Sequence, residues 1–164
     1  RKRYGESVTA HLTEFMKGRG RPESGPLDGE GRRSIYLTVL RNFLSPMMLT
    51  FDMPVPFSTF GCRNVSNVPA QSLTLMNDPF VKQQAEFWAK NIIKEDSDFN
   101  KRIENIYQKA FSRLPSGKEI EEVKMFFEEQ KSIYKTESNI EIELLIWTDF
   151  CHSIFMMKEF VGAK

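Results

Sequence analysis

The sequence has few of the residues from which catalytic and metal sites are usually built. Its 164 residues include only two cysteines, Cys62 and Cys151, and two histidines, His11 and His152. Each histidine stands without a second histidine or a close carboxylate at metal-ligand spacing, which argues against a zinc site. The chain also lacks the Cys-x-x-Cys-His pattern that attaches a c-type haem. We therefore expect no metal, no cofactor and no catalytic residue in this chain.

A strong charge excess and a long apolar run are absent as well. The net charge is only +1, whereas a dedicated nucleic-acid binder usually carries a large basic excess. No apolar run approaches the roughly 20 residues of a membrane-spanning helix, and no stretch resembles a signal peptide. We expect neither nucleic-acid binding nor membrane insertion by this segment. Because the first residue is Arg1 rather than methionine, we also expect the chain to be part of a longer protein.

Apolar and aromatic residues are plentiful in the sequence, and in the second half they follow a helical period. The chain is 40% hydrophobic and contains 14 phenylalanines, enough for a sizeable aromatic core. Apolar residues recur on one face of a helix that begins at Asp78-Pro79, and again on a helix that runs from Phe99 to Leu114. Two Ser-x-x-Glu patterns, at 116–119 and 138–141, predict the starts of two more helices. The last of these is apolar around most of its circumference, which places it at the centre of a bundle.

The first half of the chain is irregular in its pattern. A short amphipathic piece at 8–16 precedes a Gly/Pro-rich loop at 17–31. Residues 34–40 predict either a short strand or the first turns of a buried helix that reaches Leu44, and short helices are expected to begin at Pro46 and Pro69. The resulting expectation is one mainly α-helical domain, in which a loop-rich half (1–78) wraps a bundle of about four helices (79–164).

Arginines and single carboxylates alternate through the irregular half. They are Arg32, Arg33, Arg41 and Arg63 on the basic side, and Asp28, Asp52 and Asp78 on the acidic side. One interpretation is an arginine-lined site for a carboxylate, sulfate or phosphate group. The other is a structural ion-pair network that locks the irregular backbone. We favour the network, because arginines buried on loops require partners.

Possible nucleophiles have no convincing partner in the sequence. Cys151 and His152 are adjacent on a predicted helix, where side chains point about 100° apart and cannot readily meet. Cys151 lies on the apolar stripe, which predicts a buried and inert thiol, and two unpaired thiols are favoured over a Cys62–Cys151 disulfide. Ser24, Ser34 and Ser45 lack a Gly-x-Ser-x-Gly setting and an evident histidine partner.

Three stretches between residues 25 and 81 resemble a known family. They read GPLDGEGRRSIYL, RNFLSPMMLTFDMP and RNVSNVPAQSLTLMNDPFV, and they are similar to the C-terminal domain of unknown function of large exported proteins of planctomycetes, Bacteroidetes and related bacteria. The later segments IYQKAFSRLPSGKEI and WTDFCHSIFMMKEF resemble the middle and closing helices of that domain. The resemblance implies a periplasmic or cell-surface protein with upstream domains, such as a cytochrome-c-like one. Cys62 departs from the family, which usually has arginine there.

These observations favour a non-catalytic structural or interaction module of an exported multidomain bacterial protein, which packs on upstream domains or on a partner. One alternative is part of an enzyme that acts on polysaccharide or sulfated glycan through the arginine-lined anion site. The scattered acids of the irregular half argue against it, since glycan hydrolases generally use two carboxylates at a defined separation. Another alternative is a redox accessory that docks on a cytochrome-c-like domain through the basic N-terminal face.

Overall fold

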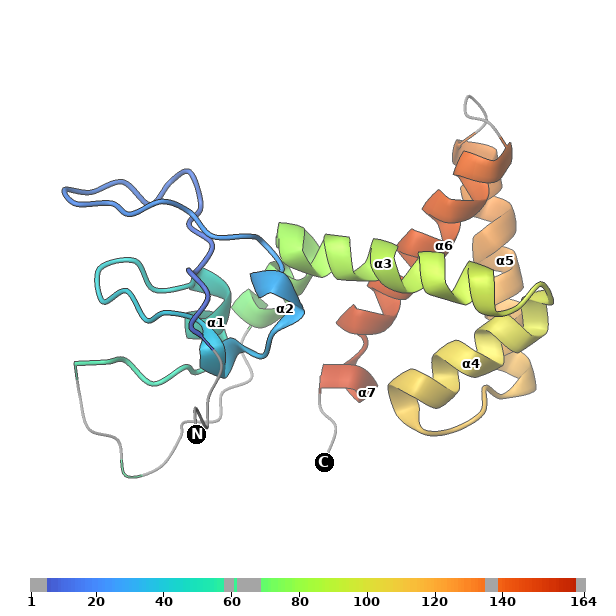
Figure 1. The fold of residues 1–164 in the computed structure, drawn as a ribbon. Coiled ribbons are helices and arrows are strands. Elements are labelled where there is room, and N and C mark those ends of the chain that lie inside the picture. The colour runs from blue at the N-terminus through green and yellow to red at the C-terminus, as the bar shows by residue number, and fades with distance from the viewer. Residues whose placement is uncertain (1–5, 58–60, 62–68, 135–138, 162–164) are drawn as a thin grey trace. The chain divides into compact units, whose positions relative to one another are not determined.

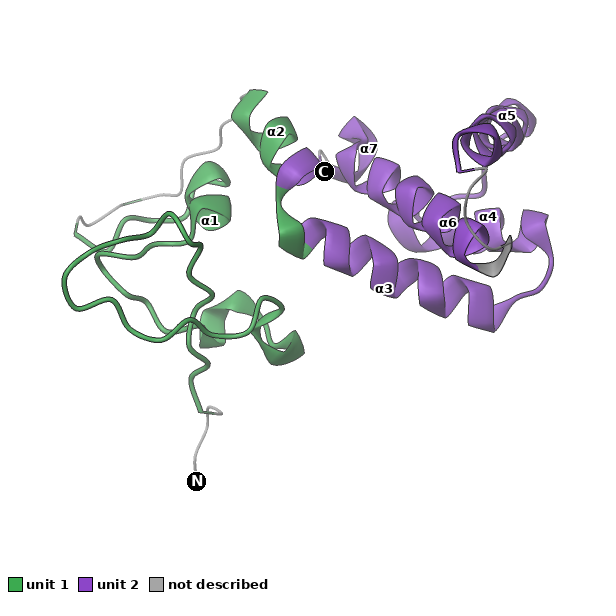
Figure 2. Cartoon of the chain, turned by 90° about the horizontal axis from the view of Figure 1, so that it is seen from above, with its two compact units in different colours: residues 1–74, 78–80 green, residues 75–77, 81–164 purple. Residues whose placement is uncertain are grey.

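The computed structural model describes residues 6–57, 61, 69–134 and 139–161, with only the backbone described at 139 and 140. Within these residues the chain forms two compact units, coloured separately in Figure 2. Unit 1 comprises residues 1–74 and 78–80, and unit 2 comprises residues 75–77 and 81–164. The elements in order are η1 (Gly29–Gly31), η2 (Ser34–Tyr36), α1 (Pro46–Thr50), α2 (Pro69–Asn77), α3 (Pro79–Glu95), α4 (Phe99–Phe111), α5 (Gly117–Ile133), α6 (Asn139–Met156) and α7 (Lys158–Val161).

Unit 2 is a bundle of four long helices, α3 to α6, followed by the short α7 (Figure 1). This confirms the prediction of a mainly helical protein with a loop-rich first half; that the first half wraps the bundle stays a prediction. None of the helices in the described ranges combines the length and the hydrophobicity needed to cross a bilayer.

Local capping explains where the long helices begin. Asp78 accepts a hydrogen bond from the Phe80 amide (2.8 Å) at the start of α3, and Asp98 accepts one from the Lys101 amide (2.9 Å) at the start of α4. Ser116 and Glu119 form the predicted capping box of α5. Side-chain acceptors at these positions satisfy amides that have no partner within the helix.

The prediction that the second helix extends to Leu114 is wrong. α4 ends at Phe111, because Ser112 adopts a left-handed conformation (φ 57°) and donates its amide to the carbonyl of Gln108. Such a residue terminates a helix, and Pro115 follows shortly after. Leu114 is 64% exposed and does not join the core.

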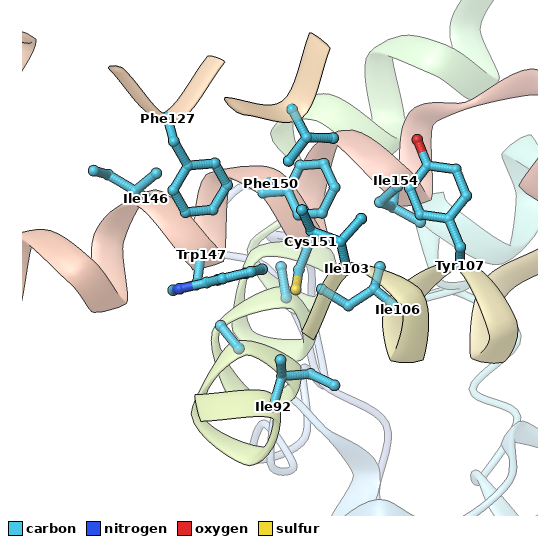
Figure 3. Packing of buried hydrophobic residues seen from close by; sticks show 13 residues of the cluster. Ile92, Ile103, Ile106, Tyr107, Phe127, Ile146, Trp147, Phe150, Cys151 and Ile154 are labelled. Atoms are coloured by element: carbon cyan, nitrogen blue, oxygen red, sulfur yellow. The ribbon is translucent and has the colours of Figure 1, made fainter. Parts of the chain in front are cut away.

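The core of unit 2 is built around α6. Figure 3 shows side chains from the bundle helices gathered around Trp147 and Cys151. Trp147 is 1% exposed, and its ring lies 4.6 Å from that of Phe127 and 5.6 Å from that of Phe99, measured between centroids. α6 supplies five core residues: Ile146, Trp147, Phe150, Cys151 and Ile154. The predicted central position of the last helix is therefore confirmed.

One arginine is buried at the edge of this core. Arg102 is 8% exposed, and its guanidinium lies 5.5 Å from the centre of the Trp147 ring. It donates hydrogen bonds to the backbone carbonyls of Ile93 and Asp96 and forms an ion pair with Glu143. The charge is tolerated because these acceptors replace the water that it loses.

Unit 1 is held by backbone hydrogen bonds between extended segments. Val8, Ala10 and Leu12 are buried at every second position, a strand-like period. Val8 donates its amide to the Tyr36 carbonyl (2.9 Å) and accepts from the Thr38 amide (2.8 Å), which makes an isolated parallel bridge with Leu37. The alternative of a helix from residue 34 to Leu44 is therefore wrong: a 3-10 turn leads into extended chain.

Gly25 brings a third segment against these two. Its amide donates to the Ala10 carbonyl (3.0 Å), and a Cβ atom added at position 25 would lie 1.8 Å from the Thr9 carbonyl oxygen. Real Cβ atoms essentially never approach a backbone atom so closely. The crossing of residues 9–10 and 25 therefore requires glycine.

The two short helices of the first half begin where predicted. Ser45 caps α1, with Pro46 in its first turn, and α2 begins at Pro69. Gln71 of α2 is 7% exposed and donates from Nε2 to the carbonyl of Thr50, the last residue of α1 (3.1 Å). This hydrogen bond joins the two helices within unit 1.

Candidate functional site

The arginines singled out in the sequence have different environments. Arg32 is half-buried; it donates to the backbone carbonyl of Glu6, and its guanidinium lies 4.6 Å from the centre of the Tyr36 ring. Arg33 and Arg41 are exposed, and neither forms an ion pair within the described residues. Arg63 lies outside the described residues.

Two of the three predicted acidic partners, Asp28 and Asp78, accept hydrogen bonds from backbone amides. Asp28 Oδ1 accepts from the Glu30 amide (3.1 Å) at the start of η1, and Asp78 caps α3. Asp52 has a positive φ of 59° just after α1. Among the described residues, no ion pair joins Arg32, Arg33 or Arg41 to Asp28 or Asp78. The full set of seven residues as one network stays a prediction.

A serine and a histidine that the sequence did not connect lie next to each other in unit 1. Ser24 Oγ is 3.3 Å from His11 Nδ1, so the expectation that Ser24 has no histidine partner is wrong. The two residues are 13 positions apart and belong to irregular segments, where no periodic signal links them. Only the crossing of the segments around Gly25 brings them together.

The hydrogen bonds of this pair determine what it can do. His11 Nδ1 lies 3.1 Å from the Gly25 carbonyl oxygen. A carbonyl oxygen only accepts hydrogen bonds, so Nδ1 carries the proton. This nitrogen then has no lone pair with which to take a proton from Ser24. Ser24 Oγ also accepts from the Leu12 amide (2.9 Å). The pair therefore fixes two segments together and lacks the arrangement of a nucleophile and its base.

A polar cleft of about 350 Å³ opens beside this crossing. It is lined by residues 6–9, 23–26, 30 and 32, which include three carboxylates, from Glu6, Glu23 and Glu30, and one arginine, Arg32. The excess of carboxylates opposes binding of an anion. The arginine-lined anion site predicted from the sequence therefore does not coincide with this cleft.

A second polar cluster centres on Arg113 in unit 2. Its guanidinium makes two hydrogen bonds to Glu119 (2.7 and 3.0 Å) and two to Glu159 of α7 (2.8 and 2.9 Å). Hydrogen bonding to Arg113 lowers the pKa of Glu119 to about 2 and also lowers the pKa of Glu159. Because two carboxylates already occupy the guanidinium, the cluster links α7 to the α4–α5 turn and offers little to a ligand.

Several polar groups in or next to α6 also make structural contacts. Cys151 is a free, fully buried thiol, and burial raises its pKa to about 12. The His152 ring donates from Nε2 to the Leu75 carbonyl (2.9 Å) in the last turn of α2. Tyr134 donates to Asp149 (2.7 Å), and this hydrogen bond, with burial, raises the pKa of Tyr134 to about 12. The described residues contain no group of three potential metal ligands.

Large apolar side chains remain on the surface of unit 2. Phe87 of α3 is 62% exposed, and Met125 of α5 is 59% exposed. Each follows a buried residue by two positions, Ala85 and Val123 respectively, and so is turned about 200° from the core. In the sequence, each of the two is an apolar residue that falls outside the apolar stripe of its helix. These two side chains, one on α3 and one on α5, are the candidate binding residues of the bundle.

Comparison with family models identifies the family of the chain. The model described as PSD1, protein of unknown function (DUF1553), matches residues 1–127. The chain belongs to the DUF1553 family. No curated protein and no solved structure matches it.

The DUF1553 match contains unit 1, α3, α4 and α5 as far as Phe127. It includes the three stretches of 25–81 on which the resemblance was based, and all seven predicted arginines and aspartates. It ends before α6, so the resemblance of the closing segment WTDFCHSIFMMKEF lies outside the matched residues. The candidate surface residues Phe87 and Met125 both lie within the match.

Proposed function

We propose that this DUF1553 chain is a non-catalytic interaction module of an exported multidomain bacterial protein. The observation that carries the proposal is the exposure of large apolar side chains on the bundle. The polar groups of the clusters described above cap helices, fix turns or bind backbone. Large apolar side chains, by contrast, are left available for a partner.

The bundle can present such a surface in a fixed geometry. Phe87 projects from α3, whose opposite side carries the core residues Val81, Ala85, Ala89 and Ile92. A helix anchored by a close-packed core loses little conformational entropy when it binds, which favours association. Exposed aromatic and methionine side chains are enriched at protein interfaces. The exposed faces of α3 around Phe87 and of α5 around Met125 are therefore each suited to an apolar partner surface.

The partner that we propose is the upstream part of the same polypeptide. The resemblance to domains that follow cytochrome-c-like modules in exported proteins supports this choice, and so does the irregular, multi-segment unit 1 that precedes the bundle. The proposed location is the periplasm or the cell surface.

The test measures association between this chain and the upstream region of its parent protein, produced as two polypeptides. We expect saturable binding by calorimetry, and we expect Phe87→Ser and Met125→Ser each to weaken it about fivefold or more, as interface residues do. Lys82→Ser, at an exposed position of α3, is the matched control and should bind normally. Absence of binding, or binding unaffected by both apolar substitutions, would contradict the proposal.

Exposed Arg33 and Arg41, without ion-pair partners in the described residues, favour a second candidate function. In it the chain binds anionic groups of a polysaccharide or sulfated glycan through these arginines. Added sulfate would then stabilise the folded protein by mass action, and Arg33→Ala with Arg41→Ala would abolish that stabilisation. Equal melting temperatures with sulfate and with chloride at matched ionic strength would exclude this function.

A further inference from the structure

A short hairpin at residues 13–21, here called the basic hairpin, projects from unit 1. It is the dark blue loop at the upper left of Figure 1. Two consecutive turns form it: the Met16 amide donates to the Thr13 carbonyl (3.0 Å), and the Arg21 amide donates to the Gly18 carbonyl (3.3 Å). Gly20 has a φ of 76°, a conformation that glycine adopts without strain. The backbone of the hairpin is therefore specified locally.

The hairpin is also attached to the rest of unit 1. Arg21 donates from its guanidinium to the Thr13 carbonyl (3.2 Å), which closes the base of the loop. A Cβ atom at Gly18 would meet the buried ring of Phe43 at 3.4 Å, so the backbone of the loop rests on that ring. These contacts hold one side of the hairpin against unit 1, and Phe15 faces the solvent.

Phe15 is 94% exposed, more than any other large apolar side chain described in the protein. Burying a phenylalanine side chain is favourable, so nearly full exposure of Phe15 is a cost without a benefit in the isolated chain. Lys17, Arg19 and Arg21 follow at every second position and are all exposed, against one acid in the loop, Glu14. The loop thus combines one exposed apolar side chain with three cations, of which Arg21 also donates to the Thr13 carbonyl at the base.

We propose that the basic hairpin is a peripheral docking element for an anionic lipid bilayer. Phe15 enters the interface between headgroups and acyl chains, while Lys17, Arg19 and Arg21 lie against anionic headgroups. An apolar anchor and a basic patch reinforce each other in this way at membrane surfaces. The contact involves a loop tip only and requires no spanning helix.

The shape and the charge of unit 1 favour a bilayer over a soluble partner. The nearly complete exposure of Phe15 means that no groove formed by the described residues surrounds it, so the partner has to enclose the tip. A lipid interface deforms around such a tip without a prepared pocket. The cleft of unit 1, by contrast, is lined by Glu6, Glu23 and Glu30 and repels anions. Because the whole chain has a net charge of only +1, the attraction is local and should weaken within a Debye length as salt is added.

The test is co-sedimentation of the chain with vesicles of phosphatidylglycerol and phosphatidylcholine at low salt, with pure phosphatidylcholine vesicles as the reference. We expect binding to the anionic vesicles only, and loss of binding in 0.5 M NaCl. Phe15→Ser should reduce the partition coefficient about tenfold or more, as removal of one buried phenylalanine does. Lys17→Glu combined with Arg19→Glu should reduce it at least about twenty-fivefold, since each cation contributes roughly fivefold.

Two matched controls use unit 2. Phe87→Ser removes an exposed phenylalanine of the proposed protein interface, and Lys82→Glu with Lys124→Glu reverses two exposed lysines; both variants should bind vesicles normally. No sedimentation of the unaltered chain with anionic vesicles would overturn the proposal. It would also be overturned if Phe15→Ser bound normally and a soluble polyanion competed fully, because the cations would then recognise a polyanion without lipid. Neither result affects the binding test at Phe87, so the two proposals fail separately.

Discussion

At the scale of single residues, several described polar side chains bind backbone groups that regular secondary structure leaves without a partner. Ser24 joins two segments through the Leu12 amide, Asp28 fixes the turn at η1, and His152 donates to a carbonyl of α2. Each supplies a hydrogen bond to a backbone group that has no partner in a helix or between strands. No described buried side-chain nitrogen or oxygen lacks a partner. Hydrogen bonds of this kind explain how the loop-rich unit 1 holds one conformation.

Arg33 provides the residue-scale prediction. Because it is exposed and forms no ion pair within the described residues, Arg33→Ala should change the free energy of unfolding by less than about 0.5 kcal/mol. Arg102→Ala is the contrasting variant, since Arg102 is 8% exposed and bonded to two carbonyls; it should cost about 2 kcal/mol or more. Urea denaturation measures both. A loss of 3–5 kcal/mol at Arg33 would instead reveal the buried ion pair that the sequence suggested.

At the scale of elements, the start of α5 shows how one side chain serves two purposes. Glu119 accepts from the amide and the hydroxyl of Ser116, which completes the capping box, and it also binds Arg113. Arg113 in turn holds Glu159 in α7. The carboxylate at the start of α5 therefore fixes both the helix terminus and, through Arg113, the preceding α4–α5 turn.

This arrangement predicts a specific dependence of stability on pH. The pKa of Glu119 is lowered to about 2 by Arg113, against 4.5 for an unperturbed glutamate. As pH falls, the unfolded chain takes up this proton first, so the stabilisation is complete above about pH 4.5 and is lost as pH approaches 2. Glu119→Gln should cost about 0.5–1 kcal/mol at pH 7, as an exposed ion pair does, and progressively less below pH 4.5. Thermal unfolding from pH 2.5 to 7 measures the difference.

The matched control is Glu121→Gln, which removes an exposed carboxylate from the same helix. It separates the specific pairing with Arg113 from the general effect of one negative charge. A cost at Glu119 that stayed constant over the whole pH range would show that the ion pair contributes nothing.

Elements with local signals were predictable from the sequence. The capping box at 116–119, the starts at Pro46, Pro69 and Pro79, and the apolar circumference of α6 each depend on residues within one or two turns. The Val8–Leu37 bridge and the Ser24–His11 contact depend on segments that meet only after the chain has folded. The end of α4 at Phe111 was missed because Ser112 adopts a left-handed conformation, which serine rarely signals. The environments of Arg33 and Arg41 were not predictable from the sequence, because composition alone does not say which residues of an irregular segment meet.

At the scale of the whole molecule, the two units are stabilised differently. Unit 2 buries a cluster of 13 residues that includes Trp147, Phe127 and Phe150. Among its described residues, unit 1 buries only a few apolar side chains, such as Val8, Leu12 and Phe43, and relies on backbone crossings such as the one at Gly25. Hydrophobic burial therefore dominates the stability of the second unit, and hydrogen bonding and close backbone approach are more important in the first.

Trp147 tests this description of unit 2. Trp147→Ala should reduce the free energy of unfolding by about 3–5 kcal/mol, because it leaves a cavity among packed aromatic rings. Glu128→Ala, at an exposed position of α5, should cost less than about 0.5 kcal/mol. Urea denaturation followed by circular dichroism at 222 nm reports on the helices of this unit. Equal stability of the two variants would show that α6 is not central.

Because α6 is the last long helix of the chain, unit 2 can complete its folding only late in synthesis. The ribosome makes α3, α4 and α5 first, and their inward faces, with Ile92, Ile103 and Phe127, are only partly covered until Trp147 and Ile154 emerge. Proteins synthesised from the N-terminus expose such surface transiently, and chaperones shield it. Unit 1 makes contacts within itself and can fold before α6 is synthesised. A nascent chain arrested before residue 139 should therefore be captured by chaperones, and release should coincide with the arrival of the last long helix.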